Sequence, residues 1–237
     1  MSRKITLFLK ILSPLFGVGG FIFYALFYSS YFLVTQVDII GAHRISQEEI
    51  IKRSGIKPGA SMFSFFESRV GGELLKNPWV KEANISRELP GKVVIEIKER
   101  EPFCLLSGDD GIVYYMSRAG EILGEATPES GMDFPTITGV GSDALGVGLL
   151  EEAIAILRLS RESTQLNWDG VSEVNLSTLY GVTLLTSDGR RVEFGRGEIE
   201  DKWHRVEKII AHAGEKNLSV DYINVVARDL GVVNFKF

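Results

Sequence analysis

Residues 11–37 form an uninterrupted run of 27 positions without a charged side chain, and most of them are Leu, Phe, Ile, Val or Tyr. A helix rises about 1.5 Å per residue and the hydrocarbon core of a bilayer is about 30 Å thick, so about 20 apolar residues can cross it. We therefore predict a transmembrane helix at 11–36. The alternative is a cleaved signal peptide, but its apolar region would span only about 7–15 residues before a small-residue cleavage site, which is missing here.

Charges on either side of this run predict its orientation. Arg3, Lys4 and Lys10 precede it, and the first charged residue after it is Asp38. The positive-inside rule places such a basic flank in the cytoplasm. We expect residues 1–10 to be a cytoplasmic tail and roughly 200 residues after the helix to lie outside, in a periplasm if the cell has one.

The charge balance and the single cysteine exclude several functions. The chain has 26 basic and 31 acidic residues, and without the three bases of the tail the balance is 23 to 31, a net charge of −8. A nucleic-acid partner or an anionic lipid surface would require a basic face, so neither is expected. Cys104 is the only cysteine, which rules out an internal disulfide and a cysteine-based metal site, and its apolar neighbours predict a core position.

The first exported segment, residues 37–101, reads as a small α+β domain. A strand is predicted at 35–41, and Ser46 with Glu49 forms a capping box that begins a short helix. Apolar residues at helical spacing predict a second helix over 63–77, stopped by a proline. Two strands follow, at 79–88 and 91–100. The order β-α-α-β-β packs two helices on one face of a small mixed sheet.

The second segment, residues 102–237, reads as a mixed-sheet β domain with two helices. Helices are predicted at 149–161 and 199–213, where apolar residues recur at three and four positions. Alternating apolar residues and turn signals predict the strands, at 102–106, 112–116, 120–124, 134–138, 171–176, 182–186, 191–194, 222–226 and 232–237. The fold class of the whole chain is thus α+β with one N-terminal membrane helix.

A catalytic or metal-binding set does not assemble from the sequence. Of the three histidines, His204 and His212 lie eight positions apart on one helix, whereas a two-ligand helical metal site needs a spacing of four. Residues 54–57 (SGIK) match the S-x-x-K pattern of penicillin-binding enzymes, but the accompanying K-T-G is missing. A membrane-tethered enzyme acting on peptidoglycan is an alternative that lacks its nucleophile, base and metal here. No enzyme activity, cofactor or metal is expected.

The final strand predicts an interaction surface. Val233, Phe235 and Phe237 alternate with Val232 and other residues along it, so one face is apolar. An unpaired strand edge pairs readily with another chain unless something blunts it. Either Lys236 blunts this edge and the phenylalanines are core residues, or a partner adds a strand to it.

Several strings in the two exported segments resemble the FtsQ/DivIB family of bacterial division proteins, in which a POTRA domain follows a membrane helix. POTRA domains have the β-α-α-β-β order predicted above. The resemblance is strongest in these strings: VDIIG at 37–41 with RIS at 44–46, NPWVKEA at 77–83, RELPG at 87–91, VIEIKEREP at 94–102 and FGR at 194–196.

The resemblance implies a function and a set of contact residues. A member of this family is expected to be a non-catalytic inner-membrane protein with a periplasmic bulk at the division septum, which links the bitopic partners FtsB and FtsL. The implied partner-binding residues are Tyr222, Val226, Arg228, Gly231, Val232 and Asn234, with Phe194, Gly195 and Arg196 nearby. A POTRA-type envelope chaperone is another alternative, but such proteins usually carry several POTRA units or a large barrel.

Overall fold

The computed structural model describes residues 17–20, 23–24, 30–127, 133–141, 148–228 and 230–236. The chain divides into two compact units, residues 1–100 and 101–237. Within the described ranges, no helix has both the length and the apolar character needed to cross a membrane. The predicted tail at 1–10 and half of the predicted membrane helix at 11–36 lie outside the described residues.

The last part of the predicted membrane helix belongs to the first unit. Ser30–Phe32 form a short 3-10 helix, η1, and Val34 is buried in the core of this unit. The backbone N–H of Val34 donates to the carbonyl of Ala60 at 2.8 Å, and that of Gly59 donates to the carbonyl of Val34 at 2.8 Å. The prediction that an apolar helix continues to residue 36 is therefore wrong for these residues, because their backbone pairs with a neighbouring loop.

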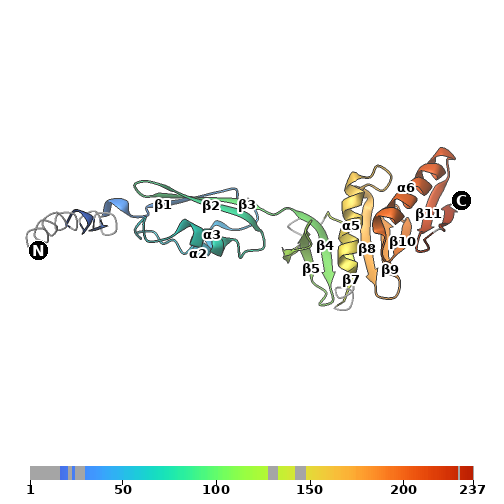
Figure 1. Cartoon of the computed structure of the whole chain (residues 1–237), viewed down its shortest axis with the longest axis horizontal. Helices are drawn as coiled ribbons and strands as arrows, with labels where there is room; N and C mark the ends of the chain where they lie inside the picture. The colour runs from blue at the N-terminus through green and yellow to red at the C-terminus, as the bar shows by residue number, and fades with distance from the viewer. Residues whose placement is uncertain are drawn as a thin grey trace, which may run out of the picture. The chain divides into compact units, whose positions relative to one another are not determined.

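The first unit has the predicted β-α-α-β-β order. Its elements are β1 (Gln36–Ile40), α2 (Gln47–Ser54), α3 (Glu67–Leu74), β2 (Val80–Glu88) and β3 (Lys92–Glu99). The sheet order is β1-β3-β2, with β1 parallel and β2 antiparallel to the central strand. Both helices lie on one face of this sheet (Figure 1).

Local signals explain where the two helices begin and end. The Ser46 side chain accepts a hydrogen bond from the N–H of Glu49 at 3.2 Å, and Gly55 ends α2 with a left-handed φ of 66°. The second helix is shorter than the predicted 63–77. Residues 61–64 form a turn instead, in which the N–H of Ser64 donates to the carbonyl of Ser61 at 3.0 Å. Phe66 is consequently an exposed N-cap residue rather than part of the apolar stripe.

A carboxylate at the end of β3 fixes the loop between β1 and α2. Glu99 Oε1 accepts hydrogen bonds from the backbone N–H groups of His43, Arg44 and Ile45 at 3.0, 2.9 and 3.0 Å. Hydrogen bonds to a charged acceptor are stronger than neutral ones. Glu99 thus ties the last strand of the unit to its first loop, a role that strand periodicity does not reveal.

The second unit is built on one mixed sheet of nine described strands. Its strands are β4 (Pro102–Gly108), β5 (Val113–Ser117), β6 (Ile122–Glu125), β7 (Thr136–Val140), β8 (Val171–Ser177), β9 (Gly181–Thr186), β10 (Arg191–Gly195), β11 (Ser219–Asn224) and β12 (Val232–Lys236). The order is β12-β11-β10-β9-β8-β7-β4-β5-β6. Three pairs, β4–β7, β7–β8 and β10–β11, are parallel. The predicted mixed sheet is confirmed.

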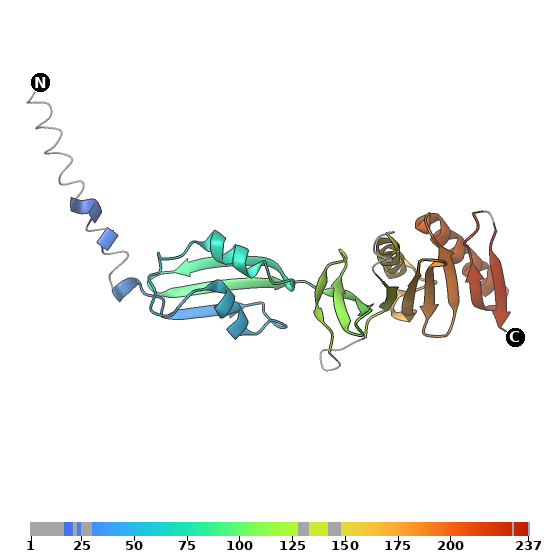
Figure 2. The same cartoon turned by 90° about the horizontal axis from the view of Figure 1, so that it is seen from below.

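Two helices cover one face of this sheet, α5 (Leu149–Glu162) and α6 (Ile199–Glu215) (Figure 2). The short 3-10 helix η3 (Trp168–Gly170) precedes β8. Along α6, the predicted apolar stripe of Ile199, Trp203, Val206 and Ala213 is buried, and these side chains share one core with the sheet. Both predicted helices are confirmed, with bounds that differ by one or two residues.

Strand β11 begins and ends earlier than the predicted 222–226. The structure has it at Ser219–Asn224, and the register shifts between Val220 and Tyr222. A bulge at this point puts Val220 and Ile223 in the core although two residues separate them, which breaks the period of two. The predicted strand was therefore displaced toward the C-terminus, because regular alternation does not extend through the bulge.

Candidate interaction surface

Strand β12 forms one edge of the nine-stranded sheet. It pairs only with β11 among the described strands, and its other side is open. Val233 and Phe235 pack against the core, whereas Asn234 is exposed and Val232 is 63% exposed. The predicted alternation of an apolar and a solvent-facing side is therefore present at the positions that the structure describes. The side chains of Lys236 and Phe237 lie outside that description.

The backbone direction of β12 follows from its neighbours. The N–H of Val225 donates to the carbonyl of Glu193 at 2.9 Å, so Ile223 and Val225 direct their backbone polar groups toward β10. Residues 222 and 224 then face β12, where they pair with Asn234 and Val232. Because successive residues of a strand alternate in this respect, the N–H and C=O groups of Val233 and Phe235 point to the open edge.

In two predicted contact residues, Val232 and Asn234, the side chain and the backbone have different roles. Val232 and Asn234 offer exposed side chains, but their backbone groups are used within the sheet. An added strand would instead pair with the backbone of Val233 and Phe235. The sequence alone does not distinguish these alternate positions, because the hydrogen-bonded side of each residue depends on the register with β11.

Three segments lie at the end of the sheet where β12 begins. They are residues 178–180 between β8 and β9, residues 196–198 between β10 and α6, and residues 225–228 with 230–231 between β11 and β12. A Cβ added to Gly195 would approach Val226 Cγ1 to 3.0 Å, and one added to Gly181 would meet the backbone of Gly195 at 2.2 Å. The ends of β9, β10 and β11 are therefore in close contact.

The predicted residues 194–196 have three different environments. Phe194 is fully buried and stacks on Trp203 with ring centroids 6.0 Å apart and an interplanar angle of 8°. Gly195 has a left-handed φ of 69°, which favours glycine. Arg196 is exposed, and its guanidinium donates a hydrogen bond to the carbonyl of Thr178. Of the three, only Arg196 presents a side chain to solvent.

The connection between β11 and β12 is held by α6. Arg205 donates from Nη1 to the carbonyls of Ala227 and Arg228 at 2.8 and 2.7 Å, and from Nη2 to the carbonyl of Val225 at 3.3 Å. Arg228 forms an ion pair with Glu198 at 2.5 Å. The arginine that was predicted to contact a partner thus already has an acidic partner within the chain.

Tyr222 and Asn224 are joined to β10 through one carboxylate. The Tyr222 hydroxyl donates to Glu193 Oε2 at 2.9 Å, and Asn224 Nδ2 donates to the same oxygen at 2.7 Å. Gly231 lies on the other side of the hairpin, where an added Cβ would approach Ile209 Cδ1 to 3.2 Å. Tyr222 and Gly231 therefore support the hairpin. The exposed predicted residues are Arg196, Val226, Arg228, Gly231, Val232 and Asn234.

Two exposed apolar residues on this surface were not singled out from the sequence. Leu179 and Tyr180 are 83% and 77% exposed. They lie in the turn that contains Thr178, whose carbonyl accepts the hydrogen bond from Arg196. A turn usually carries small or polar residues, so two large apolar side chains at 179–180 were the available signal. Lys202 and Arg205 were also missed, because a basic residue on an amphipathic helix is usually solvated.

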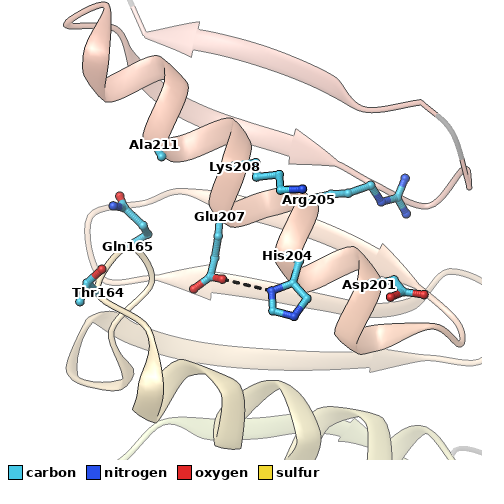
Figure 3. Close-up of a pocket in the computed structure, with 8 residues that line it drawn as sticks. All are labelled: Thr164, Gln165, Asp201, His204, Arg205, Glu207, Lys208 and Ala211. Atoms are coloured by element: carbon cyan, nitrogen blue, oxygen red, sulfur yellow. Dashed lines mark ion pairs between the residues drawn. The ribbon is translucent and has the colours of Figure 1, made fainter.

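A second feature, on the outer side of α6, is a shallow hollow of about 820 Å³ (Figure 3). Charged side chains of both signs line it, and His204 Nδ1 lies 3.6 Å from Glu207 Oε2. Both histidines of α6, His204 and His212, are exposed. In the part of the chain that the structure describes, no three His, Cys, Asp or Glu side chains gather in a way that could hold a metal ion.

Cys104 is a core residue, as predicted. Its side chain is completely buried in β4, and burial raises the pKa of the thiol to about 12. Because the thiolate is the reactive form, we expect alkylation at about pH 8 to be roughly a thousandfold slower in the folded protein than in denaturant. Mass spectrometry after a time course with iodoacetamide measures both rates. Rapid stoichiometric labelling of the folded protein would contradict this placement.

Comparisons with known proteins match both units. Residues 32–100 match the family described as "POTRA domain, FtsQ-type", and residues 106–225 match "Cell division protein FtsQ/DivIB, C-terminal". The chain is 31% identical over 226 residues to a cell division protein FtsQ of Syntrophotalea carbinolica, covering 92% of this chain and 79% of that protein. Cell division proteins FtsQ of Geotalea daltonii and Geobacter sp. strain M21 are 26% and 28% identical, over 86% and 92% of this chain and 76% and 81% of theirs.

Proposed function

The chain belongs to the FtsQ/DivIB family of cell division proteins, and from this we propose that it gathers division partners at the septum by accepting a partner strand on the open edge of β12. Proteins of this family are generally non-catalytic. The proposed partners are bitopic division proteins of the FtsB and FtsL kind. The chaperone and enzyme alternatives have less support, because both units of the chain match this one family.

The observation that carries this proposal is the open edge of β12. Val233 and Phe235 direct two N–H and two C=O groups away from the sheet, where an extended peptide could pair with them. An exposed strand edge of this kind promotes aggregation unless a partner occupies it or a charged residue on it prevents pairing. The side chains of Val232 and Asn234 would contact the partner's side chains and so contribute to specificity, since both are exposed.

The neighbouring loops suit a partner with acidic and apolar side chains. The second unit has 22 acidic and 12 basic residues, a net charge of −10, yet Arg196, which follows β10, and Arg228, in the connection to β12, are exposed at the end of the sheet where β12 begins. Val226 is an exposed apolar residue at the same end of the sheet. Because Glu198 already pairs with Arg228, the positive charge of Arg196 is the one that would favour an acidic partner segment.

We also propose a single membrane pass with a cytoplasmic N-terminus. The α+β fold of the first unit includes residues from about 30 onward, which leaves 11–29 for the membrane. These 19 uncharged residues would span about 28 Å as a helix, close to the thickness of the hydrocarbon core. The basic residues before residue 11 support the orientation.

A site-specific crosslink tests the proposed docking edge in cells. A photoreactive amino acid replaces Asn234 in the full chain, because this exposed side chain lies on β12 without contributing to the core. Crosslinking in dividing cells followed by mass spectrometry is expected to recover small single-pass division proteins of the FtsB or FtsL kind. Ile122 is the matched control, since it is exposed on β6 at the opposite edge of the same sheet.

The two positions distinguish the possible results. A division protein captured from Asn234 and not from Ile122 supports strand addition at β12. Capture of such a partner from Ile122 alone would move the docking site to β6, and capture from neither position would overturn the proposal.

A further inference from the structure

The loop that follows β10 has an unusual backbone. Gly195, Gly197 and Glu198 have φ angles of 69°, 67° and 53°. Glu198 is one of two non-glycine residues with a positive φ in the described part of the chain. A left-handed conformation costs a residue with a Cβ about 1–2 kcal/mol, so it persists only where the surroundings impose it.

Two charged side chains, Lys202 and Glu152, hold this loop from the side of the helices. Lys202 on α6 is only 3% exposed, and its Nζ donates to the carbonyl of Arg196 at 2.7 Å. Glu152 on α5 accepts a hydrogen bond at Oε1 from the N–H of Gly197 at 3.1 Å, while its Oε2 is buried without a partner among the described residues. The two helices therefore bind consecutive backbone groups of the same loop.

Burial of this lysine has a cost that packing alone does not explain. Desolvation lowers the pKa of Lys202, with the nearby Glu152 and Glu198 carboxylates opposing that shift. Fully buried lysines are rare, and an apolar side chain of similar length would fill the space without losing hydration. The core of α6 already contains Trp203 and Val206. The ammonium group thus contributes a specific contact, the hydrogen bond to the Arg196 carbonyl.

The loop held in this way connects two parts of the interaction surface. The Arg196 side chain reaches the carbonyl of Thr178, and the Glu198 side chain pairs with Arg228. Arg205, three residues after Lys202 on α6, binds the backbone that carries Arg228. Displacement of residues 196–198 would therefore move both the Arg196 side chain and the start of the connection to β12.

We propose that Glu152 and Lys202 are positioning residues of the docking surface, which hold residues 196–198 in a left-handed conformation so that Arg196 and Arg228 are fixed before a partner binds. This inference rests on the proposed docking at β12 and names residues that do not themselves touch the partner. A pre-ordered loop spares the partner the entropy of ordering it, so its loss should lower affinity more than stability.

The test compares two lysines on the same helix. Lys202→Met removes the buried ammonium and keeps an unbranched side chain, whereas Lys208→Met changes an exposed lysine on α6. Affinity of the full chain in nanodiscs is measured for the exported segment of the FtsB-like protein from the same genome, and thermal unfolding is measured in parallel. We expect Lys202→Met to weaken binding by about tenfold or more with a small change in melting temperature, and Lys208→Met to change neither.

Two further measurements separate the possible explanations. The Glu152→Leu variant should weaken binding similarly, and the double variant should be little worse than either single one, because both act on one loop. In the unmodified chain, the Gly197 amide should be protected from hydrogen exchange by its bond to Glu152.

Each result supports or overturns this inference by itself. Unchanged affinity of Lys202→Met, affinity losses that simply follow thermal stability, or rapid exchange of the Gly197 amide would overturn it. The photocrosslink from Asn234 serves as the check on the parent proposal. If that crosslink forms but Lys202→Met binds normally, only the positioning role fails, and if the crosslink does not form, the docking edge itself is wrong.

Discussion

Replacement of Val233 by proline is expected to weaken partner binding by about tenfold or more while the protein stays folded. The N–H of Val233 points to the open edge, so proline removes a donor that an added strand would use. One backbone hydrogen bond is worth roughly 1 kcal/mol net, and the pyrrolidine ring also obstructs the incoming backbone. Calorimetric titration with the exported segment of an FtsB-like protein measures the affinity, and circular dichroism checks the fold.

Two other variants identify the cause of such a loss. Val233→Ala shortens the half-buried side chain and keeps the N–H, so it should affect stability slightly and binding much less than the proline. Val232→Pro removes a donor that bonds to β11, so it should loosen the hairpin itself. Equal losses of affinity from Val233→Ala and Val233→Pro would indicate that the side chain, and not backbone pairing, contributes to docking.

Substitution of Trp203 by alanine is expected to lower the free energy of unfolding of the second unit by about 3–5 kcal/mol, the range for a fully buried tryptophan. Trp203 lies on the buried face of α6 and stacks on Phe194 in β10. The cavity would open where α6 contacts the strands that carry the interaction surface. Urea unfolding followed by circular dichroism measures the loss.

A matched variant on the same helix is Ile210→Ala. Ile210 packs against the same core but is only partly buried, so its removal should cost clearly less than that of Trp203. Similar losses from both variants would mean that the Trp203–Phe194 stack is not the main attachment of α6.

Much of the fold follows from short-range patterns in the sequence. The capping box at Ser46, the left-handed Gly55 and the apolar stripe of α6 depend on residues within a few positions of one another. The same holds for the alternating strands of both units. The predicted β-α-α-β-β domain and the mixed sheet with two helices are therefore present, although the second helix of the first unit is three residues shorter at its C-terminal end and begins later.

Features that depend on contacts between distant segments could not be predicted. Glu99 is one example, because only the folded unit places three N–H groups around its carboxylate. The same is true of Val34, whose burial depends on a loop about 25 residues later. The sequence predicted a strand at 232–237, and the structure has β12 at Val232–Lys236, but which backbone groups face the open edge depends on the register with β11.

The register between β10 and β11 has a consequence for how binding and local stability are linked. Among the described residues, the ladder between β10 and β11 has three residue pairs, from Arg191–Tyr222 to Glu193–Asn224, and through it the β11–β12 hairpin joins the other strands. A ladder this short can open locally without unfolding of the remaining strands. A partner strand on β12 would bind the closed hairpin and not the open one. The apparent affinity for the partner is then the intrinsic affinity multiplied by the fraction of chains whose hairpin is closed, and the bound partner stabilises the closed hairpin in return.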